Sequence, residues 1–160
     1  MIDNSDDKPQ QYGHLIIIVG LPGSGKSTYM ELLRTDNPDF SFFDDYQGSA
    51  YGEDSDPRLS KHFGSLASDL KRGKTAVVSD IRYCEPGELN LFLSVVLNAA
   101  PNVTLAFRYF ENAPEVCREN VTKRDREVRV EKELELIDRL SKSYAIPTVE
   151  ILSVHNPNNS

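Results

Sequence analysis

The feature that most constrains the fold is an unbroken apolar run that ends in a glycine-rich turn. Residues 15–19 read LIIIV, and residues 20–27 follow directly with GLPGSGKS. A short apolar run without alternation is typical of a strand that is buried on both faces of a parallel sheet. The run is far shorter than the roughly 20 residues that a membrane-spanning helix needs. We therefore expect an α/β sheet built around this strand.

The turn fits the pattern G-x-x-x-x-G-K-[ST], which binds phosphate groups between a strand and a helix. Its N–H groups point inward, and the following helix adds the positive end of its dipole. Glycine is needed because a side chain would keep phosphate oxygens away. Lys26 is expected to reach the β- and γ-phosphates of ATP, and the Ser27 hydroxyl to bind Mg²⁺. The predicted nucleotide-binding residues are Pro22, Gly23, Ser24, Gly25, Lys26, Ser27 and Thr28.

Strand-like and helix-like segments alternate along the rest of the chain. Their β-branched and aromatic residues predict further strands over 41–43, 75–79, 103–110 and 148–154. Helices are predicted from near Lys26, after the prolines at positions 57, 86 and 114, and over 130–144. This alternation predicts a three-layer α/β fold of the P-loop NTPase type. Its sheet would have five mostly parallel strands, with helices on both faces and a helical lid.

One domain accounts for a chain of 160 residues. We expect this domain over residues 13–154, a lid over about 115–131, and polar tails over 1–12 and 155–160. The net charge of −7 argues against a general binder of duplex nucleic acid, although it leaves room for a local basic groove. Two cysteines are too few for a disulfide scaffold, and no export signal or membrane segment is recognised. The expected location is cytoplasmic, with no membrane partner.

Two acidic positions are predicted at the sheet edge that carries the turn. Asp80 ends the aliphatic run TAVVSD, where an acid supports Mg²⁺ directly or through water, and a helix N-cap is the alternative. Asp44 and Asp45 end the aromatic run of residues 42–45. One of them could accept the proton of an acceptor hydroxyl, and we favour Asp44, with Asp45 structural or a helix N-cap. A solvated acidic turn is the alternative for both.

Basic residues gather after Pro114, interleaved with acidic ones. An exposed helix laced with salt bridges would explain them. For any single arginine this interpretation is favoured, and the functional alternative is a lid whose arginines close over the transferring phosphoryl group. The basic residues are Arg118, Lys123, Arg124, Arg126 and Arg129.

Taken together, GLPGSGKST, the aromatic strand into DDY, VVSD and CRENVTKR resemble the P-loop kinases of the polynucleotide kinase and zeta-toxin-like group. The resemblance implies Lys26 and Ser27 as the loop lysine and hydroxyl, and Asp44 as the general base. It also implies Asp80 as the acid after the third strand. Arg124 is the best match to the lid arginine, with Arg118 and Arg126 as rivals. Two departures stand out: Gln47 replaces an arginine after DDY, and Lys123 has the spacing of the lid arginine.

The acceptor side is strongly acidic. No lysine or arginine interrupts residues 36–56, whereas seven acids lie there: Asp36, Asp39, Asp44, Asp45, Glu53, Asp54 and Asp56. A field of this sign tolerates a neutral or cationic acceptor better than a polyanionic strand, so nucleic acid is not favoured by charge. Arg82, just past Asp80, could hold an acceptor phosphate or pair with Asp45.

These features predict an ATP-dependent kinase that transfers the γ-phosphoryl group to a hydroxyl, with ATP and Mg²⁺ as cofactors. The acceptor could be a small molecule, a nucleoside or a polynucleotide 5′-hydroxyl. An ATPase switch that acts through a protein partner is the alternative class, since such proteins position water instead of an acceptor. An ATP-binding remnant without catalysis is a third interpretation, given Gln47 and the shifted lid arginine.

Overall fold

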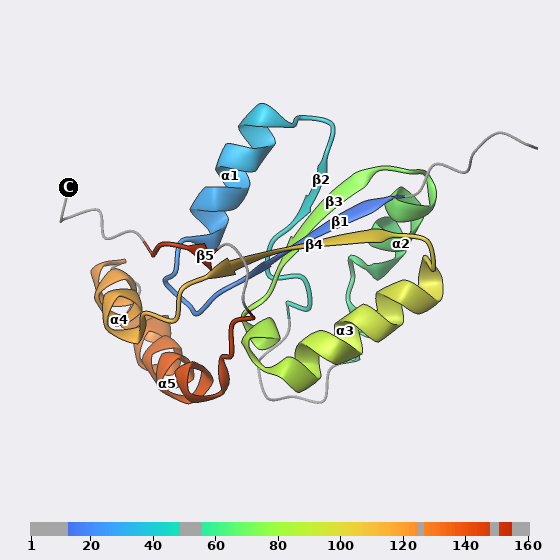
Figure 1. Ribbon diagram of the computed structural model, residues 1–160. Helices are drawn as coiled ribbons and strands as arrows, with labels where there is room; N and C mark the ends of the chain where they lie inside the picture. The colour runs from blue at the N-terminus through green and yellow to red at the C-terminus, as the bar shows by residue number, and fades with distance from the viewer. Residues whose placement is uncertain (1–12, 49–55, 125–126, 148–150, 155–160) are drawn as a thin grey trace, which may run out of the picture.

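The computed structural model describes residues 13–48, 56–124, 127–147 and 151–154. Its centre is a five-stranded sheet in the order β2-β3-β1-β4-β5, in which every neighbouring pair is parallel (Figure 1). The strands are β1 (His14–Val19), β2 (Ser41–Phe43), β3 (Thr75–Ser79), β4 (Thr104–Phe110) and β5 (Ile151–Leu152). The predicted α/β fold with five strands is confirmed.

Helices connect successive strands. In Figure 1, α1 lies above the sheet and α3 below it, so the sheet forms the middle of three layers. Among the described residues, none of the helices is both long enough and apolar enough to cross a membrane. The helices are α1 (Lys26–Asp36), α2 (Phe63–Lys71), α3 (Pro86–Ala99), α4 (Pro114–Lys123) and α5 (Glu127–Ser143), with short 3-10 helices η2 (Pro57–Leu59) and η3 (Ile81–Cys84).

Proline begins α3 and α4 as predicted, but Pro57 begins only the 3-10 turn η2. The turn ends because Ser60 adopts an extended backbone, with ψ 135°. The Ser60 hydroxyl then accepts from the backbone N–H of His62 at 3.1 Å, and α2 starts one residue later. The helix predicted after Pro57 is therefore present, but it starts at Phe63, beyond the 3-10 turn.

The central strands form the core. In β1 the side chains of Leu15, Ile17 and Ile18 are fully buried, as are those of Val77 and Val78 in β3. This agrees with apolar runs that face helices on both sides of a parallel sheet. The last helix, predicted over 130–144, begins three residues earlier than expected and packs one face against the core. Ile137 and Tyr144 are buried, and Leu134 and Val130 pack against the core.

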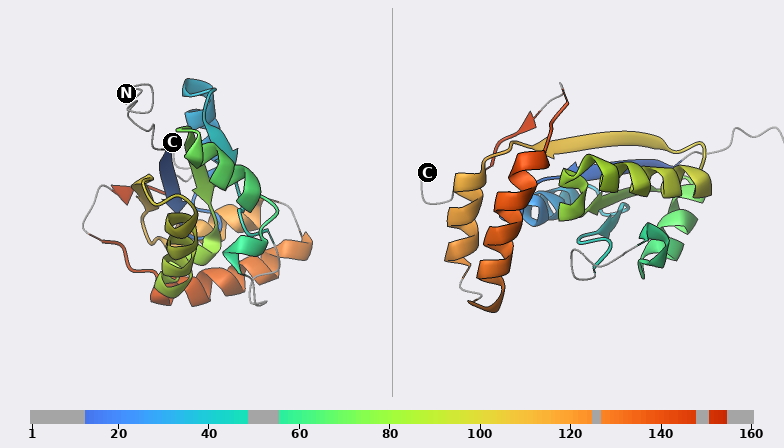
Figure 2. Two further views of the ribbon diagram at one scale, coloured as in Figure 1. Left: turned by 90° about the vertical axis from the view of Figure 1, so that its right-hand side faces the viewer. Right: turned by 90° about the horizontal axis from the view of Figure 1, so that it is seen from below.

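The helices α4 and α5 lie side by side at the end of the sheet where β1 and β4 finish (Figure 2). The Tyr144 hydroxyl, just beyond α5, donates to the carbonyl oxygens of Val19, at 3.2 Å, and Phe110. It thereby ties the base of this pair to the ends of both strands. The lid predicted over 115–131 falls on α4 and the start of α5, and residues 125–126 lie outside the described part of the chain. The predicted tails 1–12 and 155–160 also lie outside it.

Candidate active site

The glycine-rich turn between β1 and α1 has the backbone of a phosphate-binding loop. Gly23 and Gly25 adopt φ angles of 81° and 103°, which favour glycine. A Cβ on Gly23 would lie only 2.6 Å from the Cys117 carbonyl oxygen and 2.9 Å from a methyl of Val121. The loop is therefore packed directly against α4. The side-chain amide of Asn120 strengthens this contact by donating to the Gly23 carbonyl at 3.0 Å.

Lys26, the first residue of α1, bends back over the loop. Its Nζ donates to the carbonyl oxygens of Gly20, at 2.9 Å, and Leu21, at 2.8 Å. Burial lowers the pKa of Lys26, and the nearby Asp44 carboxylate is one of the groups that oppose this shift. A partly buried ammonium group held by carbonyls, rather than by a carboxylate, can move to phosphate oxygens without breaking an ion pair.

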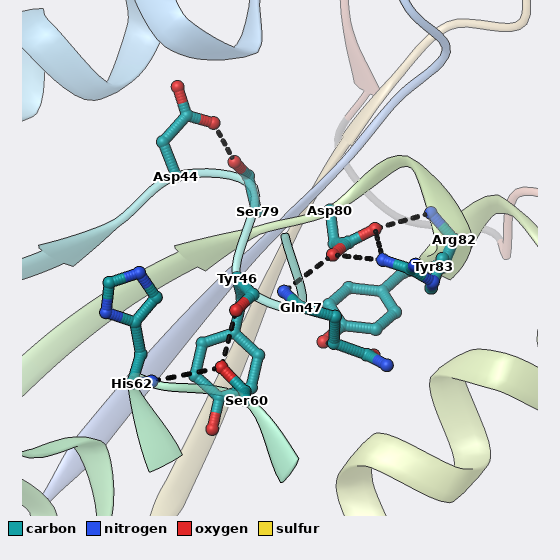
Figure 3. A network of polar contacts seen from close by, with 9 residues as sticks. All are labelled: Asp44, Tyr46, Gln47, Ser60, His62, Ser79, Asp80, Arg82 and Tyr83. Atoms are coloured by element: carbon teal, nitrogen blue, oxygen red, sulfur yellow. Dashed lines mark hydrogen bonds and ion pairs between the residues drawn. The ribbon is translucent and has the colours of Figure 1, made fainter. Parts of the chain in front are cut away.

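Three elements meet around the Asp44 carboxylate, which is exposed in the cleft. One oxygen accepts from the Ser27 hydroxyl at the start of α1 at 2.6 Å. The other accepts from the Ser79 hydroxyl at the end of β3, also at 2.6 Å (Figure 3). A carboxylate and a hydroxyl beside a phosphate loop are the oxygen ligands that Mg²⁺ prefers, with phosphates and waters completing its shell. Ser27 and Asp44 therefore fit a Mg²⁺ site.

Asp80, the acid predicted from the sequence to support Mg²⁺, is engaged in other contacts. Its oxygens accept from the backbone N–H groups of Gln47 and Arg82, both at 2.9 Å, so it forms the N-cap of η3. The Arg82 guanidinium lies 3.2 Å away, and the side chains of Arg82 and Asp80 are 3% and 0% exposed (Figure 3). The N-cap alternative thus describes the contacts of Asp80, and direct ligation of Mg²⁺ would compete with them. Its support of Mg²⁺ through water stays a prediction.

Asp45 stands next to Asp44 in a strained turn. It is the one non-glycine residue with a positive φ, 50°, in the part of the chain that the structure describes. Partial desolvation and the negative charge of Asp80 raise the pKa of Asp45. Strained backbone and a raised carboxyl pKa are both frequent at functional sites.

The lid helices contribute a mixed set of charges. Arg124, at the end of α4, lines the cleft, and its guanidinium lies 4.0 Å from the Glu133 carboxylate on α5. Lys132 of α5 lines the cleft beside them. Arg118, a rival of Arg124 for the lid role, instead donates from Nε to Asp138 at 3.1 Å, between the two helices. The other rival, Arg126, lies outside the described residues.

These groups surround one cleft of about 540 Å³. This volume is typical of small-molecule sites. Of the predicted site residues, Ser24 is buried within the loop and Thr28 is exposed outside the cleft lining. The described residues contain no cluster of three or more potential protein ligands for a metal. The predicted residues that the cleft does bring together are Pro22, Gly23, Gly25, Lys26, Ser27, Asp44, Asp45, Asp80, Arg82 and Arg124.

Sequence reasoning missed several residues of the cleft. Ser79 could have been found, because a hydroxyl directly before the acid at the end of β3 must lie at the same sheet edge. The spacing of Lys132 and Leu136, one helical turn apart, places them on one face of α5. This spacing does not indicate that the face lies toward the glycine-rich loop. The missed lining residues are Gly48, Ser79, Ile81, Lys132, Glu133 and Leu136.

Three known proteins are similar to this chain over most of its length. A protein of Acanthamoeba polyphaga mimivirus, described as uncharacterized, is 28% identical over 135 residues, which cover 84% of this chain and 88% of the relative. The crystal structure of APE1195 superposes with a TM-score of 0.62 at 19% identity, covering 91% of this chain and 86% of that one. The crystal structure of a fungal RNA kinase superposes with a TM-score of 0.62 at 12% identity. The superposition covers 85% of this chain and 67% of that one.

A family model described as "AAA domain" matches residues 15–147, which is most of the chain. The match begins in β1 and extends past α5, so it includes the glycine-rich loop, the ends of β2 and β3, and the helices α4 and α5. The chain therefore belongs to this AAA domain family and has the fold of P-loop kinases.

Proposed function

We propose that this protein is an ATP-dependent kinase that transfers the γ-phosphoryl group to a hydroxyl of an acceptor molecule. The observation that carries the proposal is the 2.6 Å contact between the Ser27 hydroxyl and Asp44. A carboxylate lies beside the phosphate loop, in a cleft of about 540 Å³ with open space next to it. Phosphoryl transfer needs such an acid at the boundary between phosphates and acceptor.

The loop residues bind the triphosphate. Backbone N–H groups of the turn and the N-terminus of α1 face the phosphates, and Lys26 exchanges its loop carbonyls for β- and γ-phosphate oxygens. Ser27 would hold Mg²⁺ directly and Asp44 would support it through water, so that the Asp44 carboxylate keeps its basicity for the acceptor. When bound, Mg²⁺ supplies positive charge that neutralises the phosphate oxygens.

The transfer itself requires a base for the acceptor. As the acceptor oxygen bonds to the γ-phosphorus, its proton passes to the Asp44 carboxylate, and the bond from that phosphorus to the β–γ bridging oxygen breaks to release ADP. Asp44 keeps free lone pairs after accepting from Ser27 and Ser79, because an ionised carboxylate offers about four acceptor positions. Asp45, with its raised pKa, lines the adjoining acceptor space.

The lid completes the site. Arg124 would leave Glu133, from which it is 4.0 Å distant, and neutralise charge on the transferring group. Such a long contact at an exposed position holds the guanidinium weakly. Lys132 of the neighbouring helix α5 provides a second cation that lines the same cleft.

Acceptor-dependent ADP formation tests this function. Wild-type protein is incubated with Mg·ATP and a panel of 5′-hydroxyl oligonucleotides, nucleosides, nucleoside monophosphates and amino sugars, with Lys26→Ala as the blank. The kinase proposal predicts ADP release that rises with one acceptor class and disappears in the variant. Release that no acceptor changes, yet that the variant loses, would instead support the ATPase alternative.

A further inference from the structure

The acceptor side of the cleft contains one arginine among the described lining residues, and that arginine is already engaged. Arg82 lies in η3, directly after β3, where it could face an acceptor. Its guanidinium instead lies 3.2 Å from Asp80, and its side chain is only 3% exposed. A guanidinium that left this pair would strand a fully buried carboxylate, which is strongly unfavourable.

Gln47 is engaged in the same way. Its backbone N–H donates to Asp80 at 2.9 Å, and its side-chain oxygen accepts from the Tyr83 hydroxyl at 3.2 Å. The residue is 7% exposed, and Figure 3 shows it beside Asp80 and Tyr83. Asp80 thus joins the turn after β2 to η3 through its contacts with Gln47 and Arg82.

The charged side chains that remain exposed at the end of β2 are both acidic. Asp44 and Asp45 both line the cleft, and both are exposed. The cleft's other cations lie on the loop and on the lid: Lys26, Arg124 and Lys132. These three lie on other elements than the acids: Lys26 begins α1, Arg124 ends α4 and Lys132 lies in α5. We assign them to the triphosphate, which is itself highly anionic.

We propose that the acceptor is a small hydroxyl compound that carries no phosphate group near its reacting hydroxyl. This inference rests on the proposed kinase function and specifies its substrate class. A phosphate placed beside Asp44 and Asp45 would meet like charge, and the Arg82 guanidinium that could offset it is held by Asp80. A neutral or amine-bearing compound meets no such penalty. The ion pair of Arg82 with Asp80 therefore determines specificity, because the Arg82 guanidinium is bound to Asp80 and does not bind an acceptor phosphate.

Matched acceptors test the inference directly. Adenosine is compared with adenosine 3′-monophosphate, which offers the same 5′-hydroxyl, and with a 5′-hydroxyl oligonucleotide. We expect kcat/KM for the best acceptor to fall by about tenfold or more when a phosphate is added to it. A phosphate-bearing acceptor that is preferred would overturn the inference while leaving the kinase function intact. If no acceptor stimulates ADP formation, the result would count against the kinase function instead.

Binding gives a second measurement that does not depend on turnover. Adenosine 3′-monophosphate is titrated calorimetrically into protein saturated with Mg²⁺ and a non-hydrolysable ATP analogue. We expect no saturable binding in the millimolar range, and saturable binding there would contradict the inference even if turnover is never detected.

The Arg82→Lys variant separates the two roles of this residue. If Arg82 holds Asp80, the ligand-free variant melts at a lower temperature, because a lysine cannot reproduce the guanidinium geometry, and the preference for acceptors without a phosphate is kept. If Arg82 binds an acceptor phosphate, the KM of phosphate-bearing acceptors rises and the melting temperature of the ligand-free protein does not change.

Discussion

The Ser27 hydroxyl donates to the Asp44 carboxylate across 2.6 Å, although the two residues are 17 positions apart in the chain. This contact joins the phosphate loop to the end of β2. Ser79 approaches the same carboxylate from the end of β3. Three elements of the sheet edge therefore fix one exposed acid at the place where a phosphate and an acceptor would meet.

Replacing this acid tests its part in the reaction. For Asp44→Asn we expect kcat to fall by about 10²–10⁴, the range of a lost general base. The affinity for ATP, measured by a fluorescent analogue without Mg²⁺, should change little, because the loop and Lys26 remain. Asp39→Asn, an exposed acid outside the cleft, is the matched control and should behave as wild type. Unchanged turnover in Asp44→Asn would remove it from the base role.

Gly23→Ala should disable the loop. Its φ of 81° and the Cys117 carbonyl at 2.6 Å from a new Cβ leave no room for a methyl group. We expect the free energy of unfolding to fall by about 1–3 kcal/mol from backbone strain, and binding of ATP to be lost. Urea unfolding and nucleotide titration measure the two effects.

The matched control for this glycine is Gly64→Ala on α2. A Cβ there meets open space, so the variant should be neutral or slightly stabilising and should bind ATP as wild type does. Wild-type ATP affinity in Gly23→Ala would show that the loop does not bind phosphate in this conformation.

The pair of Arg82 and Asp80 should contribute far more to stability than an exposed pair. Arg82→Ala leaves the fully buried carboxylate unpaired, and such losses reach about 3–5 kcal/mol. Arg58→Ala, which breaks an exposed pair with Asp56, should leave the melting temperature unchanged. Thermal unfolding of both variants at pH 7 measures the difference. Equal melting temperatures would mean that Asp80 does not depend on its arginine.

Asp45→Asn should stabilise the protein at neutral pH. Because the fold raises the pKa of Asp45 above its ordinary value of 3.8, the ionised form is disfavoured in the folded state. The penalty is absent well below 3.8 and grows as the pH rises through the folded pKa, so stability is lost with rising pH. Asparagine lacks this titration and tolerates a positive φ equally well. The difference in melting temperature between variant and wild type should therefore increase from about pH 3.5 to pH 7. A constant difference would contradict the pKa shift.

Both cysteines should resist thiol reagents while the protein is folded. Cys84 and Cys117 are free and buried. Burial raises the pKa of Cys84 to about 12 and that of Cys117 to about 11, so little thiolate exists at pH 8. We expect slow reaction with an aromatic disulfide reagent at pH 8 and two equivalents at once in urea. Fast labelling of either thiol in the folded protein would show that the region behind the loop opens.

The local parts of the site were predictable from the sequence. The strand β1, the loop and Lys26 follow from a contiguous pattern, since an apolar run and a glycine-rich turn specify their own geometry. The positions of Asp44 and Asp80 at the sheet edge follow from the ends of their strands in the same way. In a parallel sheet, all such carboxyl ends meet at one edge.

The partners of these acids were not predictable, because they depend on packing between distant elements. The contacts of Asp80 arise from the turn that brings Gln47 over β3, and nothing in VVSD specifies that turn. The roles of Arg118 and Arg124 could be distinguished only from the packing of α4 against α5. Arg118 donates to Asp138, whereas Arg124 lines the cleft. The start of α2 depended on one serine hydroxyl.

The most direct test follows the γ-phosphoryl group itself. Mg·ATP labelled at the γ-phosphorus is incubated with wild-type protein and the best acceptor of the panel, and the products are separated. The account predicts that the label appears in a phosphate ester of the acceptor, in amounts equal to ADP, and that Lys26→Ala abolishes it. Label that appears only as inorganic phosphate, whichever acceptor is present, would contradict the kinase function.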